Sequence, residues 1–476
     1  MPSLFILVPF LLLIVVNLPF KDLRGRISYR LAGTFLLAQT VVSVLYPFNI
    51  WGNQKDLLGS FFSFNLSIDN LSIVMLITIG IVAFVSLVVA VSTIEEERRR
   101  FHFTNLLLIS VIGMNATVMV RDIFSMYVFV EVTALSLFIL IALEKGKSAI
   151  EGAFKYVMLS AIASVFMLAS IGLFLLAAGG TSFDAIRQGF SNVQNNLLLK
   201  ICSGLFLCGL LIKSGAVPFH GWVPDAYSAA PSSVSVLLAG IGTKISGVYV
   251  LLRLFGSIFV VDMSVQNTLL VVGILTICFA AFAALTQVDF KRMLAYSSIS
   301  QVGYIVLALG AATPLAFAGA VFHFFNHAVF KSLLFVNAAS LEKRLGTTDM
   351  QKIGGLGSKM QVTATSSLVG LLSTAGIPPL SGFWSKLVII IALFSSGRYV
   401  YAAIALLASA LTLAYFLSLE RKVFFGEVEA APVTIPKATF GISFCEILLT
   451  VITIGAGLGF AFILNTYLLP LKEIVH

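Results

Sequence analysis

Long apolar runs constrain the fold of this chain more than any other feature of its sequence. A helix needs about 20 apolar residues to cross roughly 30 Å of hydrocarbon, and the 476-residue sequence contains such runs from end to end. Hydrophobic residues make up 59% of the chain and charged residues 11%, whereas a soluble domain carries about 25% charged residues. We therefore predict an all-α polytopic membrane protein with about 14 transmembrane helices. The predicted spans cover residues 3–20, 31–49, 68–93, 103–120, 122–143, 150–179, 197–217, 226–252, 264–286, 293–311, 313–341, 362–391, 399–420 and 439–469.

Basic residues are distributed unevenly between the predicted loops. The net charge of +9 would by itself fit a nucleic-acid partner, but most of the charge falls in alternate loops. One set of loops holds eighteen basic residues: Lys21, Arg24, Arg26, Arg30, Arg98, Arg99, Arg100, Lys145, Lys147, Lys291, Arg292, Lys343, Arg344, Lys352, Lys359, Arg421, Lys422 and Lys437. The other set holds six: Lys55, Arg121, Arg187, Arg253, Arg398 and Lys472. Because cytoplasmic loops are rich in lysine and arginine, both termini are predicted outside, and the charge implies no nucleic-acid partner.

Four ionisable residues stand alone inside apolar runs. Glu131 lies within IFSMYVFVEVTALSLFILIAL, Lys213 ends ICSGLFLCGLLIK, Lys244 interrupts VSVLLAGIGTKISGVYVLL, and Lys386 opens KLVIIIALF. Each charge near a bilayer centre costs about 2.5–3.5 kcal/mol, so four cost on the order of 10 kcal/mol, comparable to the stability of a whole domain. This cost favours a functional role, a path for protons or cations through the membrane.

Two segments of similar composition predict broken helices. LIKSGAVPFHGWVP (211–224) and AGIPPLSGFWSK (375–386) each place glycine, proline, an aromatic residue and a lysine at membrane depth. Proline removes a backbone donor and clashes with the preceding turn, and broken helices at corresponding places are typical of inverted repeats. A simple proline kink is the alternative, and a lysine beside both breaks disfavours it.

The predicted organisation is a single membrane domain, residues 1–476. Three N-terminal helices occupy 1–93, the first repeat 103–253, the second repeat 264–420, and a C-terminal helix 439–469.

A polar stripe lies between the two breaks. In FHFFNHAVFKSLLF, His323, His327 and Lys331 recur every fourth residue, so they share one face of a helix, with Asn326 beside them. A histidine in a span is often a hydrogen-bonded core residue. Two histidines and a lysine on one face favour a proton wire instead, since imidazole both accepts and donates a proton.

Structural interpretations of some charges stay open. Glu131 and Lys213 can form an ion pair buried for register alone, and His220 can be a loop residue near the first break. Asp225 and Asp289 can line an entrance or cap a loop. Lys244 and Lys386 have no acidic residue nearby in the sequence, and burial disfavours the charged form of a lysine, so these two are predicted to exchange protons.

Cofactor motifs are missing from the sequence. Cys202, Cys208, Cys278 and Cys445 show no CxxC spacing and no neighbouring histidine. No glycine-rich dinucleotide fingerprint or phosphate-binding loop stands in the context that would support it. We predict that this chain binds no cofactor or metal and has no redox centre of its own.

Several blocks of the sequence resemble the antiporter-like proton-translocating subunits of membrane complexes. LIKSGAVPFHGWVPDAYSAAPSSVSVLLAGIGTKISGVYVLLR, DFKRMLAYSSISQVGYI, FNHAVFKSLLF and GIPPLSGFWSK are similar to conserved blocks of that superfamily over about residues 65–425. It includes large membrane subunits of respiratory complex I, of Mrp-type multisubunit antiporters and of membrane-bound energy-converting hydrogenases.

The resemblance implies two inverted five-helix repeats with broken helices 7 and 12, each repeat forming a half-channel. Glu131 matches the glutamate of the fifth helix, and Lys213 the lysine of the broken seventh. Lys244 matches the central lysine of the eighth helix. His327 and Lys331 match polar residues of the eleventh, and Lys386 the terminal ionisable residue of the broken twelfth.

The function that this resemblance implies is proton translocation within a complex I-like NADH/quinone oxidoreductase or a membrane-bound hydrogenase. The alternative is an Mrp-type Na⁺/H⁺ antiporter. The expected partners are the lipid bilayer and other integral membrane subunits, including antiporter-like paralogues. Partner subunits of a redox complex are expected to carry Fe–S, flavin or NiFe centres. The transported ions are protons and, for an antiporter, Na⁺. The implied location is the cytoplasmic (inner) membrane of a bacterium or archaeon.

Two departures from the family pattern bear on the host complex. One complex I subunit type has glutamate where this chain has Lys386. The sequence also ends soon after the predicted fourteenth helix and lacks the long lateral helix of the largest subunit type, so we expect one of the shorter homologues.

Overall fold

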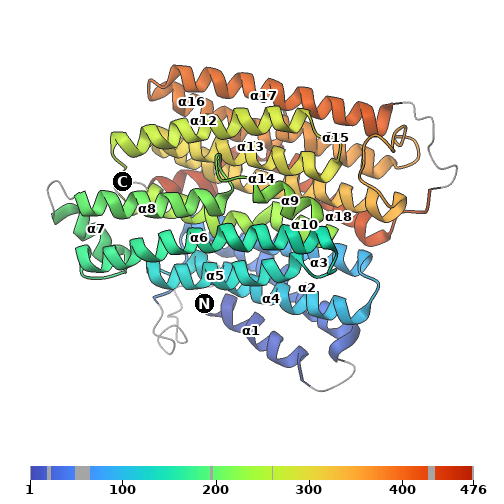
Figure 1. Cartoon of the computed structure of the whole chain (residues 1–476), viewed down its shortest axis with the longest axis horizontal. Helices are drawn as coiled ribbons and strands as arrows, with labels where there is room; N and C mark the ends of the chain where they lie inside the picture. The colour runs from blue at the N-terminus through green and yellow to red at the C-terminus, as the bar shows by residue number, and fades with distance from the viewer. Residues whose placement is uncertain are drawn as a thin grey trace.

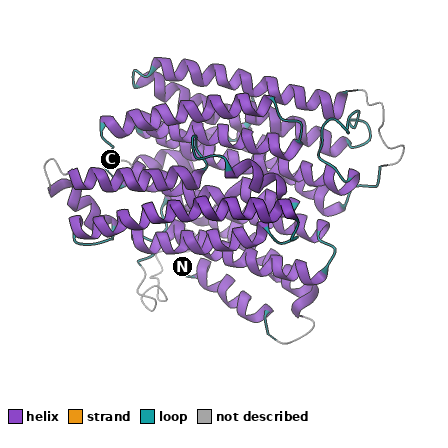
Figure 2. Cartoon of the chain, in the orientation of Figure 1, coloured by secondary structure: helices purple, strands orange, loops and turns teal. Residues whose placement is uncertain are grey.

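The protein is a bundle of helices, as the apolar runs predict. The computed structural model describes residues 2–18, 23–48, 65–192, 197–259, 261–426 and 435–473, and over these ranges it contains helices and isolated bridges but no strand (Figure 2). Twelve of the described helices are long and apolar enough to cross a membrane, and shorter apolar helices accompany them. The prediction of an all-α polytopic membrane protein is confirmed. Lys21, Lys55 and His476 lie outside the described residues.

The first half of the chain forms the lower part of the bundle as drawn in Figure 1. Its elements are α1 (Leu4–Val16), η1 (Leu23–Ile27), α2 (Ser28–Leu45), η2 (Tyr46–Phe48), α3 (Asn70–Thr93), α4 (Glu97–Met119), α5 (Ile123–Ile141), α6 (Lys147–Ala178), α7 (Phe183–Asn192), α8 (Leu197–Ser214), α9 (Trp222–Ala229), α10 (Ser232–Leu237), the π-helical turns η3 (Leu238–Gly242) and η4 (Lys244–Tyr249), and α11 (Val250–Ser257).

The second half continues upward in the same view as far as residue 425, and residues 440–473 return to the middle of the bundle, beside α3. Its elements are α12 (Met263–Leu285), α13 (Phe290–Ala311), α14 (Pro314–Leu345), α15 (Gln361–Ala375), α16 (Ser381–Ser395), α17 (Tyr399–Glu420), η5 (Arg421–Phe425), α18 (Phe440–Leu458), α19 (Phe460–Ile463), η6 (Leu464–Leu468) and η7 (Leu469–Glu473).

Burial separates central helices from peripheral ones. The segment 232–257 is buried along its most apolar stretch, and α13 and α14 nearly so, whereas α6, α12 and α17 have many exposed apolar residues. Leu176 is 80% exposed and Leu407 is 70% exposed. Apolar side chains on the outside of a bundle match hydrocarbon rather than water, so these outer helices provide the lipid-facing surface.

The two ends of the bundle differ in their loops. The Asn115 amide donates to the Phe5 carbonyl and the Tyr467 hydroxyl to the Val44 carbonyl, which places the start of α1 and the end of the chain near the loops after α2 and α4. We call this the terminal end. At the opposite end, which we call the basic end, Lys343 pairs with Glu95 at 2.6 Å and Arg344 donates to the Pro436 carbonyl.

Two predicted spans differ from the observed helices. The eighth predicted span begins at residue 226, but residues 222–229 form the separate helix α9, and the next helix begins only after Pro231. Proline is compatible with the start of a helix and not with its interior. The twelfth span, 362–391, is divided between α15 and α16, as the broken-helix prediction requires. The number fourteen, the domain boundaries and the inverted repeats remain predictions.

Candidate functional site

Both predicted breaks interrupt helices of the bundle, and each break reaches the bundle surface at its prolines. The first separates α8 from α9 and the second separates α15 from α16, with cis peptide bonds at Val217–Pro218 and Pro378–Pro379. Gly215 (φ +68°) and Gly376 (φ +88°) adopt the left-handed conformation directly after the first half-helix. Glycine reaches this conformation without a steric penalty, so it ends α8 and α15 while the chain remains at membrane depth.

Side-chain hydroxyls satisfy backbone groups that the breaks release. The Val217 N–H donates to Thr276 Oγ1 at 3.1 Å, and the Gly382 N–H donates to Ser373 Oγ at 3.2 Å. Irregular backbone at membrane depth persists only where protein or water satisfies it, and here neighbouring helices do so. The breaks are therefore held by neighbouring helices, while their prolines remain exposed.

Glu131 and Lys213 form an ion pair across three helices. Lys213 Nζ on α8 lies 2.9 Å from Glu131 Oε1 on α5. Two serines of α6 hold the pair: the Ser160 hydroxyl accepts from Lys213 at 2.9 Å, and the Ser164 hydroxyl donates to Glu131 at 2.7 Å. The structure thus brings together the first two predicted site residues and adds two hydroxyl partners from α6.

Lys244 lies at the start of the π-helical turn η4, in the most buried segment of the chain. Its side chain is 3% exposed. Its ammonium donates to the Tyr227 hydroxyl at 3.1 Å and lies 5.4 Å from the centre of the Tyr227 ring. The Thr243 hydroxyl lies 3.4 Å from the same ammonium. These partners are neutral, so they leave the lysine free to gain or lose a proton without breaking an ion pair.

Lys331 of α14 contacts a short hydroxyl chain. Its ammonium donates to Ser297 Oγ on α13 at 2.6 Å, and that hydroxyl lies 2.8 Å from the Tyr415 hydroxyl on α17. The Phe416 ring centre lies 5.3 Å from the same ammonium. Three helices therefore meet at Lys331, and a hydroxyl chain of this kind can relay a proton.

The two histidines of the polar stripe have different surroundings. His323 Nδ1 lies 2.9 Å from Ser385 Oγ on α16. Neither ring nitrogen of His327 has a hydrogen-bond partner among the described residues, and the side chain is buried. Asn326 donates to the Ser381 carbonyl at 2.9 Å and thereby ties the stripe to the second break.

Lys386 of α16 ends this series of buried groups. Its ammonium lies 4.5 Å from the centre of the Tyr304 ring and donates to Ser409 Oγ on α17 at 3.3 Å. The Tyr304 ring centre also lies 5.7 Å from that of His323, so this tyrosine connects the polar stripe to Lys386. The predicted residues from Lys244 to Lys386 are all buried.

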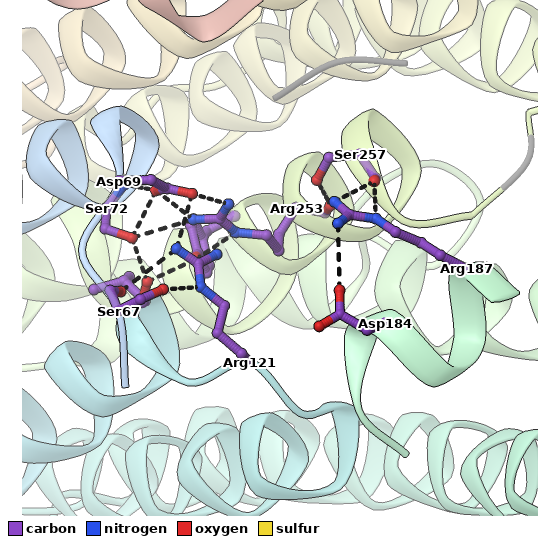
Figure 3. A network of polar contacts seen from close by, with 10 residues as sticks. Ser67, Asp69, Ser72, Arg121, Asp184, Arg187, Arg253 and Ser257 are labelled. Carbon is purple, nitrogen blue, oxygen red and sulfur yellow. Dashed lines mark hydrogen bonds and ion pairs between the residues drawn. The ribbon is translucent and has the colours of Figure 1, made fainter. Parts of the chain in front are cut away.

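A polar network fixes the terminal end of the first helices (Figure 3). Asp69 binds Arg253 through two contacts, at 2.6 and 2.9 Å, and binds Arg121 at 2.9 Å. It also caps α3 by accepting from the Ser72 N–H. Burial alone would raise the pKa of Asp69, but the charges and hydrogen bonds of Arg253 and Arg121 hold it well below the ordinary value of 3.8. Arg253, which the charge pattern places in an outward loop, is in fact 1% exposed.

Asp225 and Asp289, which the sequence assigns either to an entrance or to a loop cap, lie beside a polar hollow at the basic end, near the first break. Asp289 caps α13 by accepting from the Arg292 N–H at 2.8 Å. Asp225 binds Lys155 and Arg292, each at 2.7 Å. Burial raises the pKa of Asp225, but hydrogen bonds from these two cations outweigh it and lower the pKa overall. Asp225 therefore forms ion pairs at the edge of this hollow, whereas Asp289 caps a helix there.

Two buried glutamates were missed by sequence reasoning. Glu446 of α18 is 0% exposed and Glu420, the last residue of α17, is 2% exposed. Glu446 stands alone in FCEILLTVITIG, so the criterion that singled out Glu131 should also have found it. Glu420 precedes Arg421 and Lys422 and therefore has the pattern of a loop boundary, which hides its burial.

Metal and thiol chemistry have no assembled site among the described residues. No group of three or more histidine, cysteine, aspartate and glutamate side chains is placed to hold a metal ion within them. Cys202, Cys208, Cys278 and Cys445 are all free thiols.

A multi-pass helical fold, two broken helices and an interior series of lysines and histidines define a class of protein, the antiporter-like membrane subunit. Residues 120–412 match the family described as NADH:quinone oxidoreductase/Mrp antiporter, transmembrane. The chain belongs to this family.

Individual relatives come from different complexes. The chain is 32% identical to a subunit of the Na⁺/H⁺ antiporter of Alkalihalophilus pseudofirmus, with 83% of this chain and 82% of that protein covered. It is 29% identical to a subunit of the NADH-quinone oxidoreductase of Desulforudis audaxviator, with 87% and 85% covered. A chain of the membrane-bound sulfane sulfur reductase, an archaeal respiratory membrane complex, superposes with a TM-score of 0.87 at 27% identity, with 99% and 97% covered.

Proposed function

We propose that this chain translocates protons as one subunit of a multisubunit energy-converting membrane complex, of the complex I or membrane-bound hydrogenase type. The observation that carries the proposal is the setting of Lys244. Its ammonium is buried, and its contacts are the hydroxyls of Tyr227 and Thr243. A buried lysine among neutral partners is suited to carry a proton rather than to lock a fold.

The proposed route uses the seven predicted residues. A proton is taken up near the first break and loads Lys244, while Lys213 changes its partnership with Glu131. The proton then crosses by His327, Lys331 and bound water to Lys386, with His323 close to the Lys386 end of this path, and it leaves at the opposite side. The hydroxyls of Ser297, Ser385 and Ser409, which contact this series, support the route because they can accept and donate in turn.

The proposed orientation places the basic end in the cytoplasm and both termini outside. Both described chain ends lie toward the same end of the bundle (Figure 1), which supports an even number of crossings. The excess of lysine and arginine in the loops of the other end supports the sidedness. The chain then resides in the cytoplasmic membrane of a bacterium or archaeon.

The energy for transport comes from partners. Relatives of this chain are named as subunits of multisubunit systems, which supports a complex with other integral membrane subunits. In a complex of the redox type, Fe–S, flavin or NiFe centres of those partners supply the drive. This chain contributes the ion path and binds no cofactor itself.

The second candidate function is that of a subunit of an Mrp-type Na⁺/H⁺ antiporter. The 32% identity to a Na⁺/H⁺ antiporter protein favours it. Purification of the intact complex separates the two candidates. Co-purifying subunits with iron, nickel or flavin absorbance support the redox complex, and small hydrophobic subunits without these centres support the antiporter.

The test of translocation is the variant Lys244→Ala, with Lys200→Ala as the control. Lys200 is 60% exposed and pairs with Asp262 at the terminal end, far from the proposed route. Proton uptake is measured in membrane vesicles from the source organism that carry the assembled complex. We expect Lys244→Ala to abolish uptake while the complex assembles and Lys200→Ala to retain it. Full uptake in vesicles with Lys244→Ala would overturn the proposal.

A further inference from the structure

Two carboxyl groups lie outside the proposed route yet inside the bundle. Glu446 of α18 and Glu420 of α17 are both buried near the basic end, and both approach the same stretch of α15. We infer that they form a second proton-binding site, which loads Lys331 from the basic end. We call the glutamates and their nearest polar neighbours the carboxyl cluster. It comprises Glu420, Glu446, Asn337, Thr363, Ser366 and Ser367.

Glu446 is embedded among neutral hydrogen-bond donors. The Asn337 amide has hydrogen-bond partners for both its atoms in one orientation. Its nitrogen then donates to Ser366 Oγ at 2.9 Å and to Glu446 Oε1 at 3.3 Å, and its oxygen accepts from the Ser367 N–H at 3.0 Å. Thr363 also donates to the Glu446 carboxyl. One amide therefore connects the carboxyl of α18 to two consecutive residues of α15.

Glu420 has one donor of the same kind. Ser367 Oγ donates to Glu420 Oε1 at 2.6 Å. The second oxygen, Oε2, has no hydrogen-bond partner among the described residues, and the same is true of Oε2 of Glu446. A buried oxygen without a donor is costly for a charged carboxylate, whereas a protonated carboxyl turns that oxygen into a donor.

Charged groups near the cluster are few. Arg344 of α14 faces Glu446 from the basic end, and the Cys445 thiol is its neighbour on α18. Arg421 and Lys422 follow Glu420 in the chain and are exposed. By contrast, Glu342 on α14 pairs with Lys291 at 3.2 Å and also accepts from Ser232, as a structural ion pair does. The two cluster carboxyls lack such a buried cation, which suits groups that bind and release protons.

The cluster lies within a short distance of the proposed route. Asn337 and Lys331 are six residues apart on α14, which corresponds to about 9 Å along the helix. Glu420 and Tyr415 are five residues apart on α17, or about 7.5 Å, and the Tyr415 hydroxyl contacts Lys331 through Ser297. A proton released by the carboxyls therefore moves through water over a distance of one to two helical turns before it reaches the hydroxyls of Tyr415 and Ser297.

This inference rests on the proposed function, because a second loading site needs a route to load. It adds a second loading site in the predicted second repeat, and the transport cycle requires both this site and Lys244 to be loaded. The ligand is a proton, and the groups that bind it are the carboxylates of Glu420 and Glu446.

The test uses Glu420→Gln, Glu446→Gln and the double variant in the assembled complex, with Glu96→Gln as the control. The Glu96 side chain is 51% exposed, and its only ion-pair partner among the described residues is Arg99. Infrared difference spectra record the C=O band of protonated carboxyl groups as the pH is raised, and vesicle assays record proton uptake. We expect each single variant to lose part of the band. We expect the double variant to reduce uptake by about 100-fold, as removal of a proton-transferring group does.

The outcomes separate this inference from the proposed function. Uptake lost in Lys244→Ala but unchanged in the assembled double variant overturns the second loading site alone. Uptake retained in Lys244→Ala overturns the proposed function. If a glutamine variant fails to accumulate, Ser367→Ala takes its place, since loss of its hydrogen bond must shift the C=O band of a protonated Glu420. A band that does not shift in Ser367→Ala contradicts the inference.

Discussion

Lys213 Nζ lies 2.9 Å from Glu131 Oε1, yet the lysine side chain is 3% exposed and the glutamate side chain 26% exposed. The pair therefore bridges the interior of the bundle and its outer surface. A charge on a neighbouring subunit can act on the exposed carboxylate, and any change there alters the field at the buried lysine. This arrangement suits a pair that passes charge changes between subunits.

Glu131→Gln should impair proton uptake more than assembly. The change leaves Lys213 with the Ser160 hydroxyl as its partner. Removal of one member of a fully buried ion pair costs about 3–5 kcal/mol of stability. Because the Glu131 carboxylate is partly exposed, we expect a smaller loss here. Vesicle uptake and the thermal stability of the purified complex measure the two effects.

The double variant Glu131→Gln with Lys213→Gln is the control for this pair. If the pair acts as a unit, the two losses of uptake are far from additive. Additive losses would show that Glu131 and Lys213 act separately.

His327→Leu should separate transport from stability. Neither ring nitrogen of His327 has a hydrogen-bond partner among the described residues, so its replacement by an apolar side chain of similar size should change stability by no more than about 1 kcal/mol. Proton uptake should be lost, because leucine cannot accept or donate a proton. Thermal unfolding and vesicle uptake, measured on the same preparation of His327→Leu, show whether uptake is lost while stability is kept.

His323→Leu is the matched comparison. His323 contacts the Ser385 hydroxyl at 2.9 Å, so its loss leaves that hydroxyl with one fewer partner and should lower stability as well as uptake. Normal uptake in His327→Leu would remove this residue from the route.

Sequence patterns predicted the fold and the positions of the buried charges for one physical reason. An apolar run has to be long to cross the membrane, and a charge within it is conspicuous. The partners of these charges were not predictable in the same way. These partners come from helices that are distant in sequence. They are Ser160 and Ser164 for the pair of Glu131 and Lys213, and Ser297 and Tyr415 for Lys331.

Residues at the ends of spans were the hardest to interpret. Arg253 follows an apolar run and resembles a loop residue, but Asp69, 184 positions earlier, holds it inside the bundle. Such a pairing has no local pattern, because it depends on how α3 packs against the segment 232–257. The burial of Glu420 beside Ser367 has the same origin.

Asp69→Asn should destabilise the terminal end of the bundle. It leaves Arg253 buried with its hydrogen bonds to Tyr249 and Ser72 but without an opposite charge. Removal of one member of a buried pair costs about 3–5 kcal/mol. The free energy of unfolding of the purified complex, or its thermal midpoint, measures the loss.

The pH dependence of this loss follows from the lowered pKa of Asp69. A carboxyl whose pKa is lower in the folded state contributes its full stabilisation above the unfolded value of 3.8 and loses it only as the pH falls through the lower, folded value. The difference between Asp69→Asn and the wild type should therefore stay constant from about pH 5 to pH 8. A difference that shrinks within this range would contradict the assignment.

Lys386→Glu should be tolerated less well than Lys386→Arg, although one family type carries glutamate at this position. The Lys386 ammonium lies 4.5 Å from the centre of the Tyr304 ring, and the negative face of that ring attracts a cation by about 0.5–2 kcal/mol and repels a carboxylate. We expect Lys386→Glu to lower both stability and uptake, whereas Lys386→Arg keeps the charge and the ring contact. Tyr304→Phe keeps the ring and should preserve most of the interaction, while Tyr304→Leu should not. Equal thermal stability of the Tyr304→Phe and Tyr304→Leu complexes would show that the ring does not hold Lys386.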